Sequence, residues 1–268
     1  MSATTLTRLE RELAALTARM TARPDLTAVE LAERAGLSPD PWQARVLTSE
    51  ARQIILLCSR QAGKSTVTSV LAAHRAMSTP ESLVLLVAPA LRQSLELFRK
   101  VRGVITALGD DMPRTVDNAL TLEFTNGSRI VTLPGSEKTI RGYSGPDLII
   151  EDESARVDDA LAMAMRPMRA TKPDSQLILL SSPFGRRGHF YETWESGGQD
   201  WERVIVPATD CPRIDPVWLE SERAAIGDYW FDQEYLCVFR DAIDSAFRSE
   251  DIEAMADPGI VPLFGRTI

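Results

Sequence analysis

Residue types that could bind phosphates gather in one short segment. Residues 54–57 are an apolar run, and the chain continues Cys58-Ser59-Arg60-Gln61-Ala62-Gly63-Lys64-Ser65-Thr66. A buried strand, a loop and a helix beginning at Thr66 would turn backbone N–H groups toward phosphates. Lys64 would then reach the β- and γ-phosphate oxygens, and the Ser65 hydroxyl would bind Mg²⁺. The segment predicts a site for a nucleoside triphosphate.

This segment departs from the usual phosphate loop at one position. The pattern G-x-x-x-x-G-K-[ST] has glycine five residues before its second glycine, where this chain has Cys58. A second, independent motif is therefore needed to support the prediction.

Acidic residues supply that motif about ninety residues later. The apolar residues 148–150 predict a strand that ends in Glu151, Asp152 and Glu153. One carboxylate at a strand end can hold Mg²⁺, and the next can orient or deprotonate water. We assign these roles to Asp152 and Glu153. Alone, the residues could equally begin an acidic helix, but together with Gly63-Lys64-Ser65 they favour a Walker B motif and ATP hydrolysis.

Gln43 is a candidate for recognising the base. A glutamine amide can accept a hydrogen bond from N6 of adenine and donate one to N7. A surface glutamine that caps a helix is the alternative.

The order of predicted elements indicates how these motifs are positioned. Strands and helices alternate from residue 41 onward, and Asn126-Gly127 predicts a hairpin turn. This alternation predicts an α/β fold with a mainly parallel sheet flanked by helices and an inserted hairpin. The expected strands are 53–57, 83–88, 119–124, 129–133, 148–151, 177–180 and 204–206, and the expected helices are 27–35, 41–49, 66–77, 92–108 and 158–170.

Both ends of the chain have a different, helical pattern. Leu6, Leu9, Leu13, Leu16 and Met20 predict an amphipathic helix that packs on its own domain or serves as an arm for a partner. Residues 217–226 and 229–236 predict two short helices separated by Gly227. We expect their aromatic residues to belong to the core: Tyr229, Trp230, Phe231 and Tyr235.

Composition excludes some functional classes. The 268 residues are 44% hydrophobic and 25% charged, which is typical of one large or two smaller globular domains. No apolar run approaches the roughly 20 residues that span a bilayer, and no signal peptide is evident, so we predict no membrane partner. The net charge of −8 argues against static nucleic-acid binding, although it is compatible with a motor that touches DNA through a small basic patch.

The metal- and redox-active side chains are few. Three cysteines are widely spaced without a C-x-x-C pair, which favours a reducing, cytosolic setting without disulfides or structural zinc. Two histidines are too few for a histidine-based metal site.

Taken in order, the motifs resemble the ATPase domain of the large terminase subunit of tailed bacteriophages. The resemblance covers about residues 40 to 245, and that family also places an arginine inside a phosphate loop without the first glycine. The motifs that carry it are Pro41-Trp42-Gln43, Ser59 to Ser65, Arg141-Gly142, Leu148 to Glu153, Ser181-Ser182-Pro183 and Phe231 to Tyr235.

The resemblance implies a P-loop NTPase of the additional-strand, catalytic-glutamate type with a small helical lid subdomain. It divides the chain into an N-terminal helical arm (1–40), an ATPase core (41–210), a lid (211–250) and a linker (251–268). Family members carry a C-terminal nuclease domain after that linker. Residues 264–268 look like its first strand cut short, so we expect no nuclease activity from this chain.

The resemblance also assigns roles to residues. Arg60 would contact the γ-phosphate, and Ser181 and Ser182 would couple hydrolysis to movement, with Ser182 in place of the usual threonine. Arg141 is either an arginine finger for the neighbouring subunit of a ring or a surface charge. The nucleotide would lie against Trp42, Gln43, Ser59, Arg60, Gln61, Ala62, Gly63, Lys64, Ser65 and Thr66.

The implied activity is hydrolysis of ATP with Mg²⁺ to drive double-stranded viral DNA through a portal into a procapsid. The implied partners are that DNA, the portal, the small terminase subunit and further copies of the chain in a ring. We expect a monomer in dilute solution, located in the host cytoplasm and transiently at the procapsid portal.

Two other functions remain open from the sequence. A helicase-like nucleic-acid-dependent ATPase would need a second lobe for which the chain is too short, and the glutamate beside Asp152 argues against an ATP-binding assembly switch. The basic residues that could touch DNA, or could simply form a solvated surface, are Arg99, Lys100, Arg102, Arg186 and Arg187.

Overall fold

The structure is a computed structural model that describes residues 26–109, 113–133, 140, 142–241 and 255. The predicted leucine stripe, most of the linker and Arg141 lie outside the described residues.

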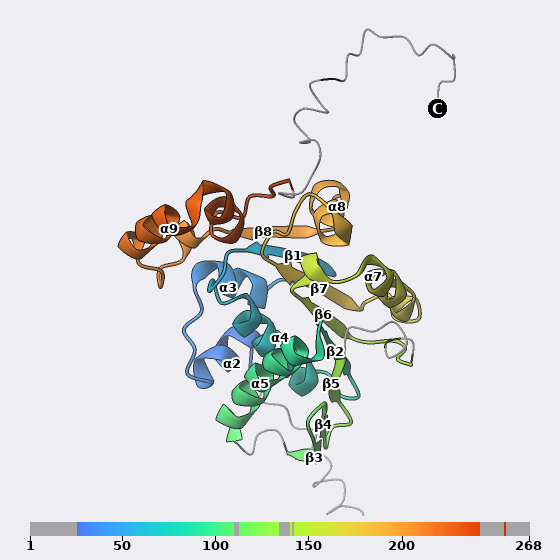
Figure 1. The fold of residues 1–268 in the computed structure, drawn as a ribbon. Helices are drawn as coiled ribbons and strands as arrows, with labels where there is room; N and C mark the ends of the chain where they lie inside the picture. The colour runs from blue at the N-terminus through green and yellow to red at the C-terminus, as the bar shows by residue number, and fades with distance from the viewer. Residues whose placement is uncertain (1–25, 110–112, 134–139, 141, 242–254, 256–268) are drawn as a thin grey trace, which may run out of the picture.

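Eight strands of the described chain form one mixed sheet, in the order β3-β4-β5-β2-β6-β7-β1-β8 (Figure 1). Six neighbouring strands are parallel to one another, in the order β5-β2-β6-β7-β1-β8. At the β5 edge, β4 pairs antiparallel with β5, and β3 pairs antiparallel with β4. The strands are β1 (Gln53–Cys58), β2 (Leu83–Val87), β3 (Arg114–Asp117), β4 (Thr121–Phe124), β5 (Arg129–Leu133), β6 (Leu148–Asp152), β7 (Gln176–Ser181) and β8 (Glu202–Val206).

The strand order confirms the predicted fold class. The strand before the phosphate loop, β1, and the strand with the acidic motif, β6, are not neighbours, because β7 lies between them. This inserted strand is the mark of the additional-strand type. Since all three are parallel, their carboxyl ends meet at one edge of the sheet, where α/β folds bind ligands. The predicted hairpin is β4–β5, and β3 was not predicted.

Helices cover both faces of the sheet (Figure 1). The N-terminal helices and the two that follow β1 and β2 pack on one face, whereas α7 and α8 pack on the other. The last helix, α9, lies beside the edge strand β8. The helices are α2 (Ala28–Arg34), α3 (Pro41–Leu47), α4 (Lys64–Ser78), α5 (Leu91–Ala107), α7 (Asp159–Met165), α8 (Gly188–Ser196) and α9 (Pro216–Glu234), with short 3-10 turns η2 (Ser154–Arg156), η3 (Arg166–Arg169) and η4 (Ala208–Asp210).

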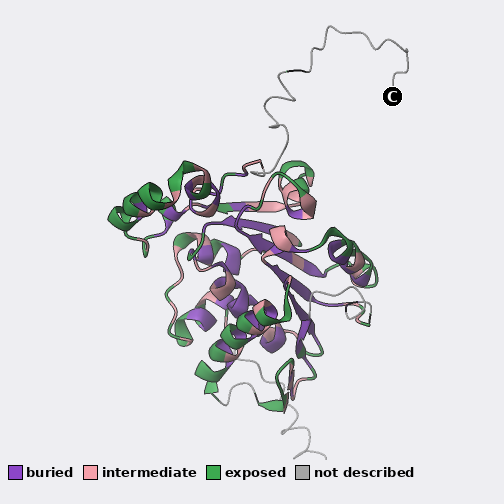
Figure 2. Cartoon of the chain, in the orientation of Figure 1, coloured by how far each residue is buried: buried purple, intermediate pink, exposed green. Residues whose placement is uncertain are grey.

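The central strands are buried on both faces, as Figure 2 shows. Alternate residues belong to different clusters: Ile54 and Leu56 pack under α4 and α5, and Ile55 and Leu57 pack on the α8 side. This two-sided burial explains why these strands are continuous apolar runs in the sequence.

The segment predicted to be a lid, residues 211–250, is described up to residue 241 and contains α9. Gly227 breaks its helical geometry at φ 78°, as its position between two helical patterns predicts. Phe231 and Tyr235 are buried, but Trp230 is 45% exposed, so the expectation that it is a core residue was wrong. None of the helices in the described part of the chain is long and apolar enough to cross a membrane.

Candidate nucleotide-binding and catalytic site

The loop between β1 and α4 is shaped by left-handed residues. Gln61 has φ 62° and Gly63 has φ 93°. A Cβ atom on Gly63 would lie 2.7 Å from Nε2 of Gln43 and 3.1 Å from Nη2 of Arg213, so a side chain there would displace both groups and would also be strained at this positive φ. Helix α4 begins at Lys64, two residues before the predicted start at Thr66. Lys64 and Ser65 therefore belong to its first turn, where helix N–H groups and the helix dipole attract anions.

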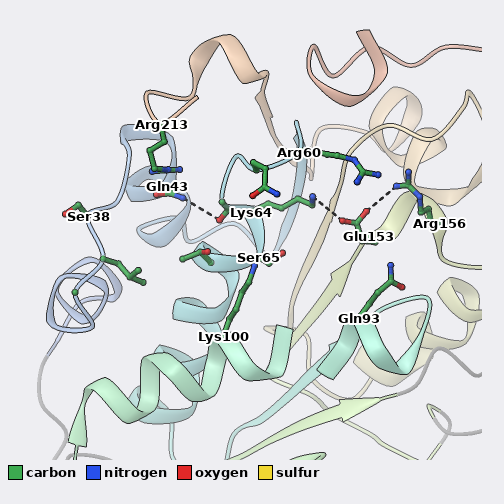
Figure 3. Close-up of a pocket in the computed structure, with 15 residues that line it drawn as sticks. Ser38, Gln43, Arg60, Lys64, Ser65, Gln93, Lys100, Glu153, Arg156 and Arg213 are labelled. Atoms are coloured by element: carbon green, nitrogen blue, oxygen red, sulfur yellow. Dashed lines mark hydrogen bonds and ion pairs between the residues drawn. The ribbon is translucent and has the colours of Figure 1, made fainter. Parts of the chain in front are cut away.

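The acidic motif meets this first turn across the sheet edge. The Ser65 hydroxyl donates to Oδ2 of Asp152 at 3.1 Å, and Nζ of Lys64 lies 3.1 Å from Oε1 of Glu153. The backbone N–H of Glu153 also donates to Oδ1 of Asp152 at 3.0 Å. Two motifs separated by almost ninety residues thus form one cluster, as Figure 3 shows for Lys64, Ser65 and Glu153.

The environment of Asp152 suits a divalent cation. Burial raises the pKa of Asp152, against the opposing effect of Lys64. Because Asp152 is only 6% exposed, a positive charge nearby would stabilise the ionised form of its carboxylate. A hydroxyl beside a carboxylate, open to phosphate oxygens and water, is the incomplete protein ligand set that Mg²⁺ prefers. Ser65 and Asp152 therefore fit Mg²⁺.

A cavity of about 710 Å³ opens over this cluster (Figure 3). Its lining combines phosphate-loop and basic residues on one side with residues 36–38, between α2 and α3, and Gln43 of α3 on the other. The lining residues are Gly36, Leu37, Ser38, Gln43, Arg60, Gln61, Gly63, Lys64, Ser65, Thr66, Gln93, Lys100, Glu153, Arg156 and Arg213. Its size and positive lining suit a nucleoside triphosphate.

The family comparison agrees with this geometry. A model of the family described as terminase large subunit, T4likevirus-type, N-terminal, matches residues 55–254. The chain belongs to this family. Large terminase subunits of Thermus phage G20c and Thermus virus P23-45 are each 26% identical to it over 217 residues, which is 74% of the chain but 44% of each relative. The chain thus spans less than half the length of these curated relatives.

Solved terminase structures share the fold. The Thermus phage P74-26 large terminase ATPase domain superposes with a TM-score of 0.68 at 21% identity, covering 81% of this chain and 99% of that domain. The large terminase of another thermophilic bacteriophage, solved in complex with ADP, gives a TM-score of 0.65 at 17% identity, covering 74% of this chain and 53% of that protein.

The residues that the terminase resemblance singled out divide into two groups in space. Gln43, Arg60, Gln61 and the segment from Gly63 to Thr66 line the cavity. Three others face the protein interior: Trp42 packs against the main core cluster, and Ser59 and Ala62 are buried.

Gln43 caps a helix and also lines the cavity. Its Oε1 accepts a hydrogen bond from the backbone N–H of Asp40 at 2.9 Å, which completes a capping box at the start of α3. Its Nε2 lies 3.5 Å from the carbonyl oxygen of Gly63 and lines the cavity. The cap fixes the direction in which the amide nitrogen points.

Arg60 is held by the last residue of α9 rather than by a phosphate-loop group. Its Nε donates to Oε2 of Glu234 at 2.5 Å, and its backbone N–H donates to the Glu234 carbonyl at 3.0 Å. Arg156 lies 3.7 Å from the same carboxylate and donates to Oε2 of Glu153 at 3.2 Å. Two arginines thus connect the end of α9 with the phosphate loop and with the acidic motif.

Sequence reasoning missed Arg156 and Arg213. Arg213 donates to the carbonyl of Ala62 at 2.9 Å and to Oδ1 of Asp40 at 2.8 Å, so it ties the phosphate loop to the start of α3. Arg156 could have been found, because it follows Glu153 by one turn. For Arg213, 151 residues from Ala62, the sequence carries no local signal.

Ser181 and Ser182 are buried at the carboxyl end of β7, where Ser181 is in register with Leu57 of β1. This places the predicted coupling segment between the phosphate-loop strand and the acidic-motif strand. Arg141 lies outside the described residues, so its role stays a prediction.

The basic residues considered for DNA contact have other contacts. Arg99 pairs with Glu96, and Arg102 donates to Asp117. Lys100 points into the nucleotide cavity (Figure 3).

Proposed function

We propose that this chain hydrolyses ATP with Mg²⁺ and that the released energy drives double-stranded viral DNA into a procapsid. The observation that carries the proposal is the convergence of Lys64, Ser65 and Glu153 at one cavity, with Asp152 buried directly behind them and hydrogen-bonded to Ser65. Membership of the terminase large-subunit family supports it. One related terminase was solved in complex with ADP and also with ATP-γ-S, which supports a nucleotide as the ligand of this cavity.

The first turn of α4 binds the phosphates. Its N–H groups and Lys64 supply positive charge, and Ser65 and Asp152 hold Mg²⁺. When bound, Mg²⁺ neutralises charge that develops on the β- and γ-phosphate oxygens. Gln43 binds adenine through its amide, as its position in the cavity allows.

Glu153 is the general base for the attacking water. Its two carboxylate oxygens are engaged by Lys64 and Arg156. A γ-phosphate competes for Lys64, which frees Oε1 of Glu153 to accept a proton from water. Hydrolysis would then depend on a filled phosphate site, because the base is released only by phosphate.

Two arginines complete the phosphate site in this proposal. Arg60 leaves Glu234 to contact the γ-phosphate. Binding of ATP therefore removes a contact between the phosphate loop and the lid. Arg141 acts on the nucleotide of a neighbouring subunit when the chains form a ring on the procapsid.

Ser181 and Ser182 transmit hydrolysis to movement, because β7 lies beside both motif-bearing strands. The portal, the small terminase subunit and duplex DNA are the partners, and the motor acts in the host cytoplasm at the procapsid portal.

Phosphate release and nucleotide binding test the catalytic part. Lys64→Ala should lose both, and Glu153→Gln should keep binding but stop hydrolysis. Glu195→Gln, an exposed residue of α8, is the matched control and should behave as the unaltered chain. Normal turnover in either site variant would rule out the proposed catalytic roles.

A further inference from the structure

The proposed catalytic base, Glu153, has an unusual backbone conformation. Glu153 has φ 52° and ψ 39°, in the left-handed region that residues with a Cβ seldom adopt. Such a conformation persists only when its surroundings hold it. The direction of the Glu153 side chain follows from this turn, so the groups that hold the turn also aim the carboxylate.

A buried polar triad of Glu151, Ser154 and His189 lies directly behind the turn. The Ser154 hydroxyl donates to Oε1 of Glu151 at 2.6 Å. Nε2 of His189 lies 2.6 Å from the same oxygen and 3.0 Å from the Ser154 hydroxyl. Glu151 and Ser154 are both 0% exposed. The triad thus joins the residues on either side of Asp152-Glu153 to a side chain from α8.

His189 is itself fixed from a second direction. Its backbone N–H donates to Oδ1 of Asp159 at 2.8 Å, and its Nδ1 lies 3.5 Å from that oxygen. His189 therefore connects the start of α7, the start of α8 and the turn at Glu153. A short loop also connects His189 to the predicted coupling residues Ser181 and Ser182. The turn at Glu153 and the coupling segment are therefore both linked to His189.

The positive charge of a protonated His189 can compensate the negative charge of Glu151. A buried carboxylate without a counter-charge would be costly. Burial by itself lowers the pKa of His189, but hydrogen bonds and charges from Glu151 and Asp159 outweigh it, and the pKa is raised. The imidazolium form compensates the negative charge of Glu151 and donates to it.

We propose that His189 is a positioning residue for Glu153. Through Glu151 and Ser154 it holds the left-handed turn that directs the catalytic carboxylate into the nucleotide cavity. This role rests on the proposed ATPase function of the site. A side chain that only stabilised the fold would affect the amount of folded protein, whereas a positioning residue affects the rate of the chemical step.

The test compares His189→Ala, His189→Gln and His74→Ala. His74 is the other histidine and is also part-buried, with a hydrogen bond to the carbonyl of Leu26 at 3.0 Å, far in sequence from the triad. Turnover is measured with and without duplex DNA, binding with a fluorescent ATP analogue, and hydrogen exchange at the amides of Arg156 and Val157. These amides donate to the carbonyls of Glu153 and Ser154.

His189→Ala should lower kcat about 10- to 100-fold, as expected when a catalytic group is misplaced, with unchanged nucleotide affinity and faster exchange at both amides. His189→Gln should restore most of kcat, because its amide can donate to Glu151. His74→Ala should leave all three measurements unchanged.

Unchanged kcat and unchanged exchange in folded His189→Ala would overturn the proposal. An equal loss of affinity and kcat would also overturn it, since that would show a general loss of the site. If the unaltered chain does not hydrolyse ATP, the proposed function fails, and hydrogen exchange alone then decides whether the triad holds the turn.

Discussion

The contact between Arg60 and Glu234 predicts that the lid competes with ATP for one guanidinium. In the proposed mechanism, Arg60 leaves Glu234 to contact the γ-phosphate. In Glu234→Gln the side chain keeps its shape and loses its charge, so the competing partner is weakened. Binding of an ATP analogue should therefore become tighter, and binding of ADP, which lacks the γ-phosphate, should not change.

The magnitude follows from the exposure of the pair. The Arg60 side chain is 58% exposed and that of Glu234 is 14% exposed. A partly exposed ion pair contributes roughly 0.2–1 kcal/mol, which corresponds to an affinity gain of about 1.5- to 5-fold. Glu234 also faces Arg156 at 3.7 Å, and the longer distance makes that contribution smaller.

Competition of ATP-γ-S and ADP with a fluorescent nucleotide measures both affinities. Glu220→Gln, an exposed position on the same helix, is the control for removing one negative charge. An unchanged or weaker affinity for ATP-γ-S in Glu234→Gln would refute the competition, as would an equal gain for ADP.

Three further predictions concern the base, the thiols and pH. Gln43→Ala should reduce the preference for ATP over GTP at least about fivefold, since a bidentate amide–adenine contact is worth roughly 1–3 kcal/mol; affinities for both nucleotides measure this, and an unchanged ratio would remove Gln43 from base recognition. Burial raises the pKa of Cys58 and raises that of Cys237 to about 12, so the thiols, all buried, should not react with Ellman's reagent until the protein is unfolded; rapid labelling of the native chain would contradict this. The pKa of His189 is raised in the folded chain above its value of about 6.5 in the unfolded chain. Protonated His189 therefore stabilises the fold fully at pH values below about 6.5, and this stabilisation is lost as the pH rises through the pKa of the folded chain. The difference in free energy of unfolding between the unaltered chain and His189→Gln, from urea denaturation, should therefore shrink as pH rises above about 6.5, and a constant difference would show that His189 does not titrate in this way.

The sequence predicted those parts of the fold that local patterns determine. Central strands are continuous apolar runs because both faces of the sheet are covered, and each of them was located within one or two residues. Helix α8 was missed: it begins at Gly188 and contains Thr193 and Trp194, so its pattern is weak and tertiary packing on the sheet forms it.

Site residues that belong to local sequence motifs could be predicted, whereas contacts between residues far apart in the sequence could not. Lys64 and Ser65 open the helix after β1, and Asp152 and Glu153 lie at the end of β6, so the parallel sheet brings them together. The contacts of Glu234 with Arg60 and Arg156 join positions far apart in the sequence, and no spacing rule announces them. The exposure of Trp230 was missed for a related reason, because a cluster of aromatic residues on a helix does not reveal which face the domain covers.

The central claim is that this cavity hydrolyses ATP and that the hydrolysis serves DNA movement. The most direct measurement is the rate of phosphate release against protein concentration, with and without duplex DNA, using Glu153→Gln as the blank. We expect turnover that is absent in Glu153→Gln and that increases with duplex DNA. We also expect the rate per subunit to rise with protein concentration, because neighbouring subunits supply arginine fingers to one another. Turnover equal in both proteins, or absent at every concentration with DNA present, would contradict it.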